Sequence, residues 1–273
     1  MKIFCKELKK DFETKAEMYA ELKSMAPEII ALKRGTEKRS DPVCLQLRSG
    51  AVKADGQEQI GIGSTIYAII NTTNYFDSHG DVHVDGIWDV SVKDQRNKLY
   101  YIINHELEIG KVISFPKDTE AYVQPLSWKE IGLDYTGNTQ ALVYKSLLTE
   151  ATNKDALYAI AHRAPIQNSV RMQYIAMALC IDDSSEDFAQ EKANFDKYIG
   201  RIANKEDAQE AGYFWAITEA KIYKEGSAVL FGSNDATPVL YSDPANTSQK
   251  QTAFDPLDNS QSLELIKNFT FLN

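Results

Sequence analysis

The stretch that most constrains the fold is residues 166–181, IQNSVRMQYIAMALCI, the longest candidate strand of the chain. Pro165 precedes it and a polar cluster at residues 182–185 follows it, so it forms one unit between two breaks. Periodicity alone does not separate helix from strand here. If the stretch is a strand, its side chains alternate between two faces, and Ser169 and Arg171 share one of them.

Strands are expected to outnumber helices in the rest of the chain. Runs rich in Ile, Val, Thr and Tyr predict strands over residues 60–72, 99–104, 111–115, 120–126, 140–147 and 213–231. Helical spacing predicts helices over residues 11–33, 153–163, 186–199 and 205–211. Pro27 is expected to interrupt the first helix. The strands at residues 111–115 and 120–126 are expected to pair with each other. The last strand is expected to break near Gly226. This order is a strand-dominated α+β pattern and not an alternating βαβ one.

Composition along the chain suggests three regions. Residues 1–57 are expected to hold an N-terminal helix and a polar linker, because residues 34–57 are polar and contain Gly, Ser, Asp and Pro. Residues 58–241 carry the strand-rich globular domain. Residues 242–273 begin with a polar segment that offers little to a core, and we expect a flexible tail there.

Charge and cysteine content exclude several classes of protein. A net charge of −9 argues against general nucleic-acid binding, because phosphate contacts need a basic patch. Three scattered cysteines without CxxC spacing indicate a reducing compartment and no zinc site. No apolar run approaches the roughly 18 residues of a membrane span, and no signal peptide is evident. We therefore expect a soluble intracellular protein, and no motif predicts nucleotide binding.

Ser169 and His105 are the residues most suited to covalent catalysis. Ser169 opens the long candidate strand, and His105 ends the apolar run of residues 99–104. A serine is a weak nucleophile until a base takes its proton, and histidine is the base best suited to neutral pH. Arg171, two residues after the serine, could neutralise an oxyanion. On the residues alone, an exposed strand end explains Ser169 better, and a solvent-facing histidine is an equally ordinary explanation of His105.

Two glutamates late in the chain could orient a histidine. Glu219 and Glu225 are six residues apart and share a face if their strand is unbroken. Either could equally be a solvated strand residue.

The remaining histidines offer a weaker alternative. His79 and His83 lie four residues apart, between and beside two aspartates, in the segment DSHGDVH at residues 77–83. Such a pair holds a metal best on a helix, whereas Gly80 and its polar neighbours indicate a loop, so a metal site is disfavoured. His162 is expected to cap the end of a helix.

Four blocks, taken in order, resemble the prohead serine proteases of tailed bacteriophages, the capsid-maturation enzymes related to herpesvirus assemblins. The blocks are DSHGDVHVDGIW at residues 77–88, INHELEIGKV at 103–112, NSVRMQYIAMAL at 168–179 and TEAKIYKEGSAVLFGSNDATPVL at 218–240. They are similar to the family's D-x-H-G-D loop, its histidine block, its serine block and its closing E-x-S-x-V block. Together they span most of the predicted globular domain, and four blocks in this order are more specific than any one alone.

The resemblance implies a role for each candidate residue. Ser169 would be the nucleophile and His105 the base, with Glu225 as the first choice and Glu219 as the second choice for the carboxylate. Val170 and Arg171, beside the serine, would meet the oxyanion. Arg171 stands where the family often has glycine. This departure is open to three interpretations: a tolerated change, a side-chain oxyanion donor or weakened activity.

The resemblance also implies a fold and a setting. The expected fold is a closed, mostly antiparallel β-barrel wrapped by helices, like that of herpesvirus proteases, with residues 58–241 as the protease domain and no metal or cofactor. Capsid scaffold and the major capsid protein would be the substrates, cut inside the assembling procapsid in the host cytoplasm, and a homo-oligomer is possible. Two alternatives are a catalytically inactive capsid-associated protein of the same fold and a metal hydrolase built on Asp77, His79, Asp81 and His83.

Overall fold

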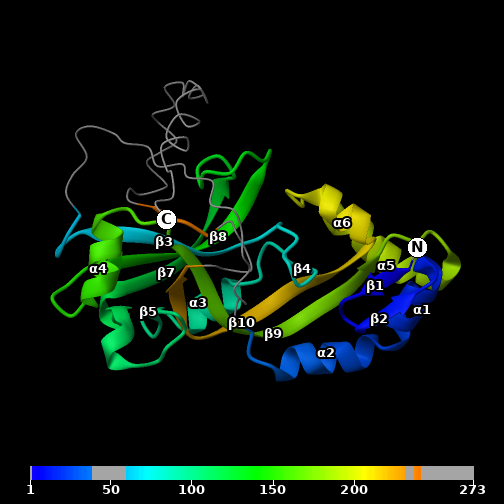
Figure 1. Cartoon of the computed structure of the whole chain (residues 1–273), viewed down its shortest axis with the longest axis horizontal. Coiled ribbons are helices and arrows are strands. Elements are labelled where there is room, and N and C mark those ends of the chain that lie inside the picture. Colours follow the sequence, from blue (N-terminus) through cyan, green and yellow to red (C-terminus); the bar gives the residue numbers. More distant parts are fainter. Residues whose placement is uncertain (1, 39–59, 231–236, 241–273) are drawn as a thin grey trace, which may run out of the picture.

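Two long strands, β9 (Gln167–Ile181) and β10 (Tyr213–Val229), pair in antiparallel fashion and run through most of the length of the molecule (Figure 1). The computed structural model describes residues 2–38, 60–230 and 237–240. The strand predicted at residues 166–181 is therefore confirmed as β9, and the chain is a strand-dominated α+β protein. The predicted linker after residue 38 and the predicted tail at residues 242–273 lie outside the described residues.

The other elements are short. The remaining strands are β1 (Ile3–Cys5), β2 (Lys10–Phe12), β3 (Thr65–Thr72), β4 (Asp81–His83), β5 (Tyr100–Ile103), β6 (Val112–Ser114), β7 (Thr119–Ser127), β8 (Asn138–Leu147) and β11 (Val239–Leu240). The helices are α1 (Lys15–Ser24), α2 (Ala26–Gly35), α3 (Asp89–Asp94), α4 (Lys154–Ala161), α5 (Ala189–Ile199) and α6 (Lys205–Ala211), with 3₁₀ turns η1 (Ile109–Lys111), η2 (Pro116–Asp118) and η3 (Glu186–Phe188).

β10 organises the first of two large sheets. Along one edge it pairs with β9, and along the other it pairs in parallel with β4 at Trp215–Ile217 and with β5 at Glu225–Ala228. β6 extends this sheet beyond β5. The second sheet is antiparallel, with strand order β11-β3-β8-β7. The sheets place the end of β5, which precedes His105, directly beside the end of β10.

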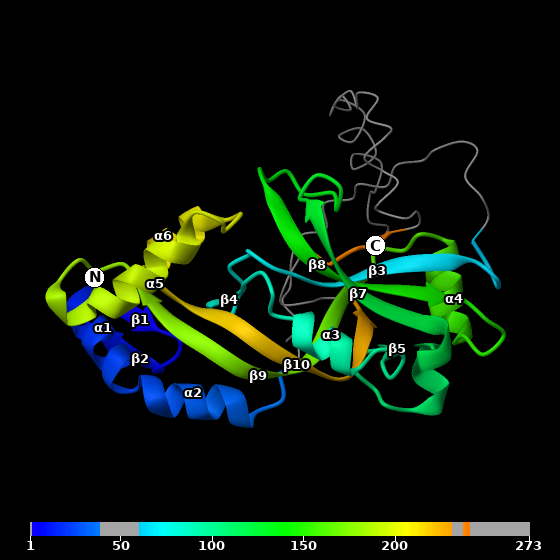
Figure 2. The ribbon, with the colours of Figure 1, turned by 180° about the vertical axis from the view of Figure 1, so that it is seen from behind.

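The predicted closed barrel is wrong for the described part of the chain. The two sheets keep separate ladders, and a single bridge between Gln167 and Pro238 links β9 to the segment that continues into β11. A proline has no N–H to extend such a ladder. The far halves of β9 and β10, with β4 alongside β10, form a narrow ribbon that reaches toward α1 and α5 (Figure 2). The result is two joined sheets and not a closed wall.

The N-terminal helices pack against this ribbon. Met18 and Leu22 of α1 belong to the same buried cluster as Leu179 of β9 and Trp215 of β10. α1 begins at a capping box formed by Thr14 and Glu17, and the helix break predicted near Pro27 is confirmed by the start of α2 at Ala26. The N-terminal segment and the strands therefore share one hydrophobic core.

Two predicted strand relations differ from the structure. Residues 111–115 and 120–126 contain β6 and β7, but β6 pairs with β5 and β7 pairs with β8. The 3₁₀ turn η2, which starts at Pro116, separates them, and no ladder forms between them in the described residues. The break predicted near Gly226 is a β-bulge, so β10 remains one strand.

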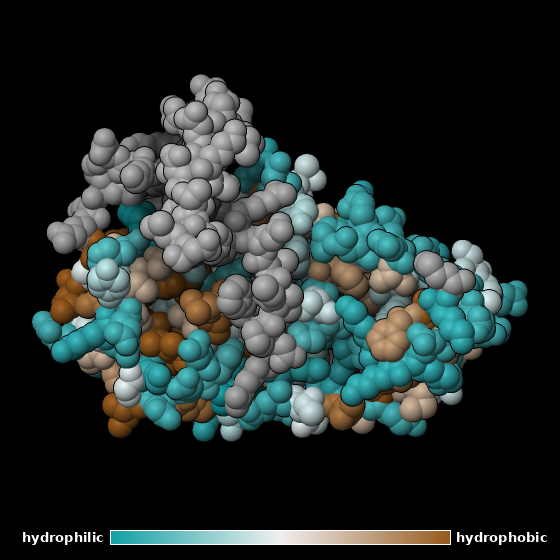
Figure 3. Space-filling view, viewed as in Figure 1, coloured by the Kyte–Doolittle hydropathy of each residue, from teal (hydrophilic) through white to brown (hydrophobic). Residues whose placement is uncertain are grey.

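Surface polarity differs between the two ends of the molecule. In Figure 3 the half that holds α4 and β5 shows more hydrophobic side chains than the half that holds α1 and α2. Exposed apolar residues on the loop after β5 include Leu107 and Ile109, which follow His105 in the chain. No helix in the described residues is long and apolar enough to cross a membrane.

Candidate active site

His105 lies in a strained turn directly after β5. Asn104 and His105 both have left-handed backbone angles, with φ of 52° and 57°. This conformation costs roughly 1–2 kcal/mol per residue without glycine. β10 holds the turn, because the Asn104 N–H donates to the Ala228 carbonyl at 2.9 Å and the His105 N–H donates to Ser227 Oγ at 2.8 Å. Strain held in place by neighbouring strands is typical of functional positions.

Glu225 contacts the imidazole of His105 from the protein interior. Its Oε1 lies 2.8 Å from His105 Nδ1, and the glutamate is 0% exposed. A bulge in β10 directs it there: three residues, Tyr223 to Glu225, stand opposite Arg171 alone, and Lys224 has a left-handed φ of 67°. Bulges of this kind redirect a side chain.

The hydrogen bond to Glu225 fixes the tautomer of His105. A carboxylate only accepts, so Nδ1 carries the proton and the lone pair lies on Nε2. That Nε2 atom is buried and has no hydrogen-bond partner in the described residues. A histidine held by a carboxylate on one side, with its other nitrogen open, is arranged as a general base.

Arg171 completes this group, which we call the His105 network (His105, Glu225 and Arg171). Its Nη2 donates to the His105 carbonyl at 2.6 Å, and its Nε lies 3.2 Å from Glu225 Oε1, an ion-pair distance without hydrogen-bond geometry. Nη1 lies 3.9 Å from Glu37 Oε2. The guanidinium therefore faces the base and its carboxylate, which does not support the interpretation of Arg171 as a side-chain oxyanion donor.

Ser169 lies on the same face of the sheet as this network. It stands directly opposite Ser227 in the β9–β10 ladder, and Ser227 binds the backbone of His105. Paired residues of an antiparallel ladder point to the same side. Ser169 is buried, and its side chain does not hydrogen-bond His105 Nε2, which has no partner among the described residues. Such bonds often form only when substrate binds.

The N–H of Val170 points away from β10. Met172 exchanges backbone hydrogen bonds with Lys38 on the outer edge of β9, and the Asn168 N–H donates to Thr237 on the same edge. Backbone groups alternate in direction along a strand, so those of Val170 also face outward. The N–H directly after Ser169 therefore points to this edge.

Glu219, the second candidate for the carboxylate, is placed differently. It is half-buried and pairs with Ala176. Irregularities in β10 on both sides of it break the strict alternation that would have put it on the same face as Glu225. Among the described residues only Glu225 of the two contacts His105.

Residues of β4, β9 and α2 form a second buried group, the His83 network (His83, Tyr174, Asp81 and Lys33). Lys33 Nζ of α2 lies 2.6 Å from Asp81 Oδ1 and 2.9 Å from Glu7 Oε1, and the Tyr174 hydroxyl donates to Asp81 Oδ2 at 2.9 Å. Burial alone would lower the pKa of Lys33, but Asp81 and Glu7 outweigh it and raise that pKa. The network ties the N-terminal helices to β4 and β9.

His83 has a partner at each ring nitrogen. Its Nδ1 lies 3.0 Å from Asn71 Oδ1, which also accepts from Trp88 Nε1, and its Nε2 lies 3.2 Å from the Tyr174 hydroxyl. Asn71 Oδ1 is therefore the acceptor for Nδ1–H. Burial lowers the pKa of His83 to about 4, so the ring is neutral at pH 7. The Tyr174 hydroxyl has one proton and lies against both Asp81 Oδ2 and His83 Nε2, so it donates to one of them at a time and in either case covers Nε2.

The metal site considered at residues 77–83 gains no support. The carboxylate of Asp81 binds Lys33 and Tyr174, and Asp77 accepts the backbone N–H groups of His79 and Asp81. In the described ranges no group of three or more His, Cys, Asp and Glu residues is placed to hold a metal ion. His162, predicted to cap a helix, is the C-cap of α4.

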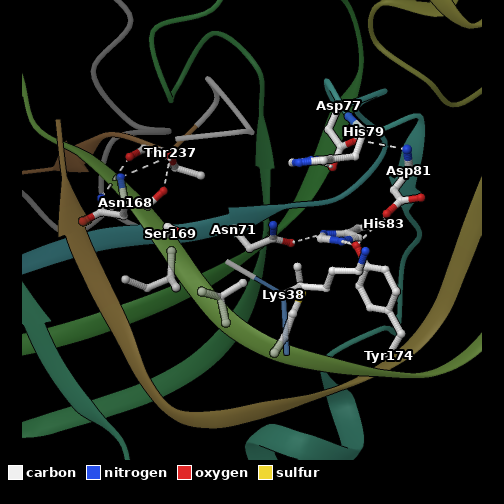
Figure 4. Close-up of a pocket in the computed structure, with 13 residues that line it drawn as sticks. Lys38, Asn71, Asp77, His79, Asp81, His83, Asn168, Ser169, Tyr174 and Thr237 are labelled. Carbon is white, nitrogen blue, oxygen red and sulfur yellow. Dashed lines mark hydrogen bonds and ion pairs between the residues drawn. The ribbon is translucent and has the colours of Figure 1, made fainter. Parts of the chain in front are cut away.

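A pocket along β9 joins the His83 network to Ser169, and no residue of the His105 network lines it (Figure 4). Asn168, Ser169 and Thr237 lie at one end, and Asp77 and His79 lie at the other. One end of the pocket therefore lies beside Ser169, the candidate nucleophile. At the other end, burial, and then the charge of Asp81, raises the pKa of Asp77 to about 7.

Two contributions to the site were not predicted from the sequence. Ser227 fixes the backbone of the base, and Arg171 binds the base and its carboxylate. The spacing of Glu225 and Ser227, two apart in one strand, was a signal for a shared face.

No family model, curated protein or solved structure matches this chain.

Proposed function

We propose that the chain is a serine endopeptidase that cuts scaffold and capsid-protein segments during maturation of a phage prohead. The observation that supports hydrolysis best is the 2.8 Å contact between His105 Nδ1 and Glu225, on the face that Ser169 shares. The prohead setting rests on the four sequence blocks that resemble that protease family.

The proposed reaction is acyl transfer to serine and then to water. Ser169 Oγ attacks the peptide carbonyl while His105 Nε2 takes its proton, and Glu225 stabilises the imidazolium. The Val170 N–H donates to the oxyanion. The intermediate collapses as His105 gives its proton to the leaving amine. Water then attacks the acyl-enzyme with His105 again as base, and Ser169 recovers its proton when the acid is released.

The setting follows from the same resemblance. Scaffold and the major capsid protein are the proposed substrates, and the site needs no cofactor for this chemistry. The enzyme would act inside the assembling procapsid in the host cytoplasm, as a monomer or a homo-oligomer. The exposed apolar residues Leu107 and Ile109, two and four residues after His105, suit contact with an extended protein segment.

A catalytically inactive, capsid-associated protein is the alternative. Two observations favour it: His105 Nε2 does not hydrogen-bond Ser169, and Arg171 occupies the position where the family often has glycine. In that case the His105 network would serve only to join β5, β9 and β10.

Labelling with a fluorophosphonate, followed by mass spectrometry, separates the two. We expect the intact chain to be labelled at Ser169 and to cut co-expressed scaffold and capsid protein. Ser169→Ala should lose both, with a rate loss of at least about ten-thousand-fold. Ser184→Ala, at an exposed serine, is the control and should match the unmodified chain. Cleavage by Ser169→Ala would overturn the assignment, and a folded but unlabelled chain would favour the inactive protein.

A further inference from the structure

Arg171 is one of the few buried cations in the described part of the chain, and its contacts have two parts. The first part is backbone: Nη2 binds the carbonyl of His105, while Ser227 Oγ binds the N–H of the same residue. Both polar groups of His105's main chain are therefore held, one by each long strand. A histidine in a left-handed turn would otherwise be free to relax to a commoner conformation.

The second part is charge. The side chain of Arg171 is 6% exposed and that of Glu225 is 0% exposed, with Nε 3.2 Å from Oε1. A carboxylate this deeply buried is costly unless a cation balances it. Arg171 supplies that cation at Oε1, the same carboxylate oxygen that contacts His105 Nδ1.

Other ionisable groups near the pair contribute less. Glu37 lies 3.9 Å from Arg171 Nη1 and is 42% exposed, so solvent screens it. Burial, and then the charge of Glu225, raises the pKa of Tyr144 well above its usual value, so that hydroxyl stays neutral. Arg171 is therefore the main charge that acts on the His105–Glu225 pair from outside it.

We infer that Arg171 is a positioning residue of the proposed hydrolytic site, which holds the base in its turn and balances the charge of Glu225. This inference rests on the proposed function and extends it. It assigns a purpose to the residue at which the chain departs from the protease pattern. Where the family often has a flexible glycine near the serine, Arg171 would instead fix the orientation of His105.

Removing the cation has a predictable sign. In its acid form the pair is an imidazolium beside a carboxylate, and loss of the Nε2 proton leaves a neutral Nδ1–H imidazole and one buried negative charge on Glu225. Without Arg171 that charge is not balanced, so the proton is lost only at higher pH. The midpoint of the pH–rate profile on its acid side should therefore move upward.

The test compares three variants by their rate of fluorophosphonate labelling across pH. Arg171→Met should label about 10- to 100-fold more slowly, with a midpoint at least about one pH unit higher. Arg171→Lys restores a charge but not the fork that reaches two acceptors. Its midpoint should return most of the way while its rate stays reduced. Arg201→Met removes an exposed arginine, 65% exposed beside Asp85, and should change neither quantity.

A readout that needs no activity separates this inference from the proposed function. The titration midpoint of the His105 ring, followed by NMR in the Ser169→Ala background, should rise on adding Arg171→Met. If the unmodified chain is never labelled, the proposed function fails, while the NMR titration still tests the role of Arg171. If labelling occurs but the rates and midpoints of both Arg171 variants equal those of the unmodified chain, the inference is overturned. If Arg171→Met does not fold, Arg171→Lys decides by the same two readouts.

Discussion

The two buried networks have the same kinds of parts and different outcomes. Each joins a histidine, a carboxylate and a cation from distant segments: His105, Glu225 and Arg171 in one, and His83, Asp81 and Lys33 in the other. In the first, Nε2 of the histidine has no partner in the described residues, whereas in the second each ring nitrogen lies against a polar side chain, with the Tyr174 hydroxyl shared between Nε2 and Asp81. A satisfied network stabilises a fold, and one with an open nitrogen can transfer a proton.

The backbone supports the same distinction. His105 lies in a left-handed turn at the end of β5, while His83 lies within β4, which pairs with β10. The cost of a strained residue persists only where surrounding structure holds it. Strain is thus concentrated in the network that also has the open nitrogen, and regular pairing is found in the network without one.

Replacing each histidine by alanine should give opposite results, and this is the largest effect we expect. His105→Ala should reduce scaffold cleavage by about ten-thousand-fold, because it removes the proposed base for the proton of Ser169. His83→Ala should retain activity in its folded fraction but lower the free energy of unfolding by about 2 kcal/mol, since it leaves buried polar partners unbound. Cleavage rates and urea unfolding measure the two losses.

The contrast would break if the losses were exchanged. An active His105→Ala variant would make the His105 network structural only. A His83→Ala variant that unfolds normally but fails to cut would place the second network in the chemistry.

Much of this contrast could be predicted from the sequence, because it depends on local patterns. The apolar run of residues 166–181 placed Ser169 on a strand, and the run before His105 placed the base at a strand end. The resemblance to the protease family then favoured Glu225 over Glu219, and the structure brings Glu225 to His105.

The rest depends on contacts between segments far apart in the chain. The bulge at Tyr223–Glu225 lies where the register of β10 shifts against β9 and its pairing with β5 begins, and nothing in its own composition specifies it. The contact between Lys33 and Asp81 joins residues 48 apart in the chain, so the aspartates could be read from the sequence as metal ligands. Both depend on how distant segments pack together, and local periodicity carries no information on that packing.

A second experiment concerns the acid at the edge of the His83 network. The carboxyl pKa of Asp77 is about 7 in the fold, above its ordinary 3.8. The folded chain thus binds the extra proton between these values, and stability contributed by this group is full below about pH 4 and is lost as pH rises to 7. Asp77→Asn keeps the acceptor oxygen and removes this loss.

The expected result is a difference that grows with pH. By urea unfolding, Asp77→Asn should equal the unmodified chain near pH 4 and exceed it by roughly 2–4 kcal/mol at pH 8. His83, with its pKa lowered to about 4, acts in the opposite direction, so its contribution is lost as pH falls from 6.5 to 4. That contribution is common to both proteins and cancels in the difference. A difference independent of pH would show that Asp77 does not titrate in this range.

The smallest expected effects come from two glycines that support the networks by different means. A Cβ at Gly226 would lie 2.9 Å from atoms of Ile70 and Tyr144, on the face opposite Glu225. Gly80, beside Asp81, has open space around it but a φ of +76°.

Gly226→Ala should therefore cost about 1–3 kcal/mol through overpacking and should also slow cleavage, because Glu225 and Ser227 must shift. Gly80→Ala should cost about 1 kcal/mol through backbone strain and leave cleavage unchanged. Gly110→Ala, with open space and no left-handed angle, controls for the added methyl group. Equal cleavage rates for Gly226→Ala and Gly110→Ala would mean that the His105 network tolerates movement of β10, which would contradict the requirement for a fixed base.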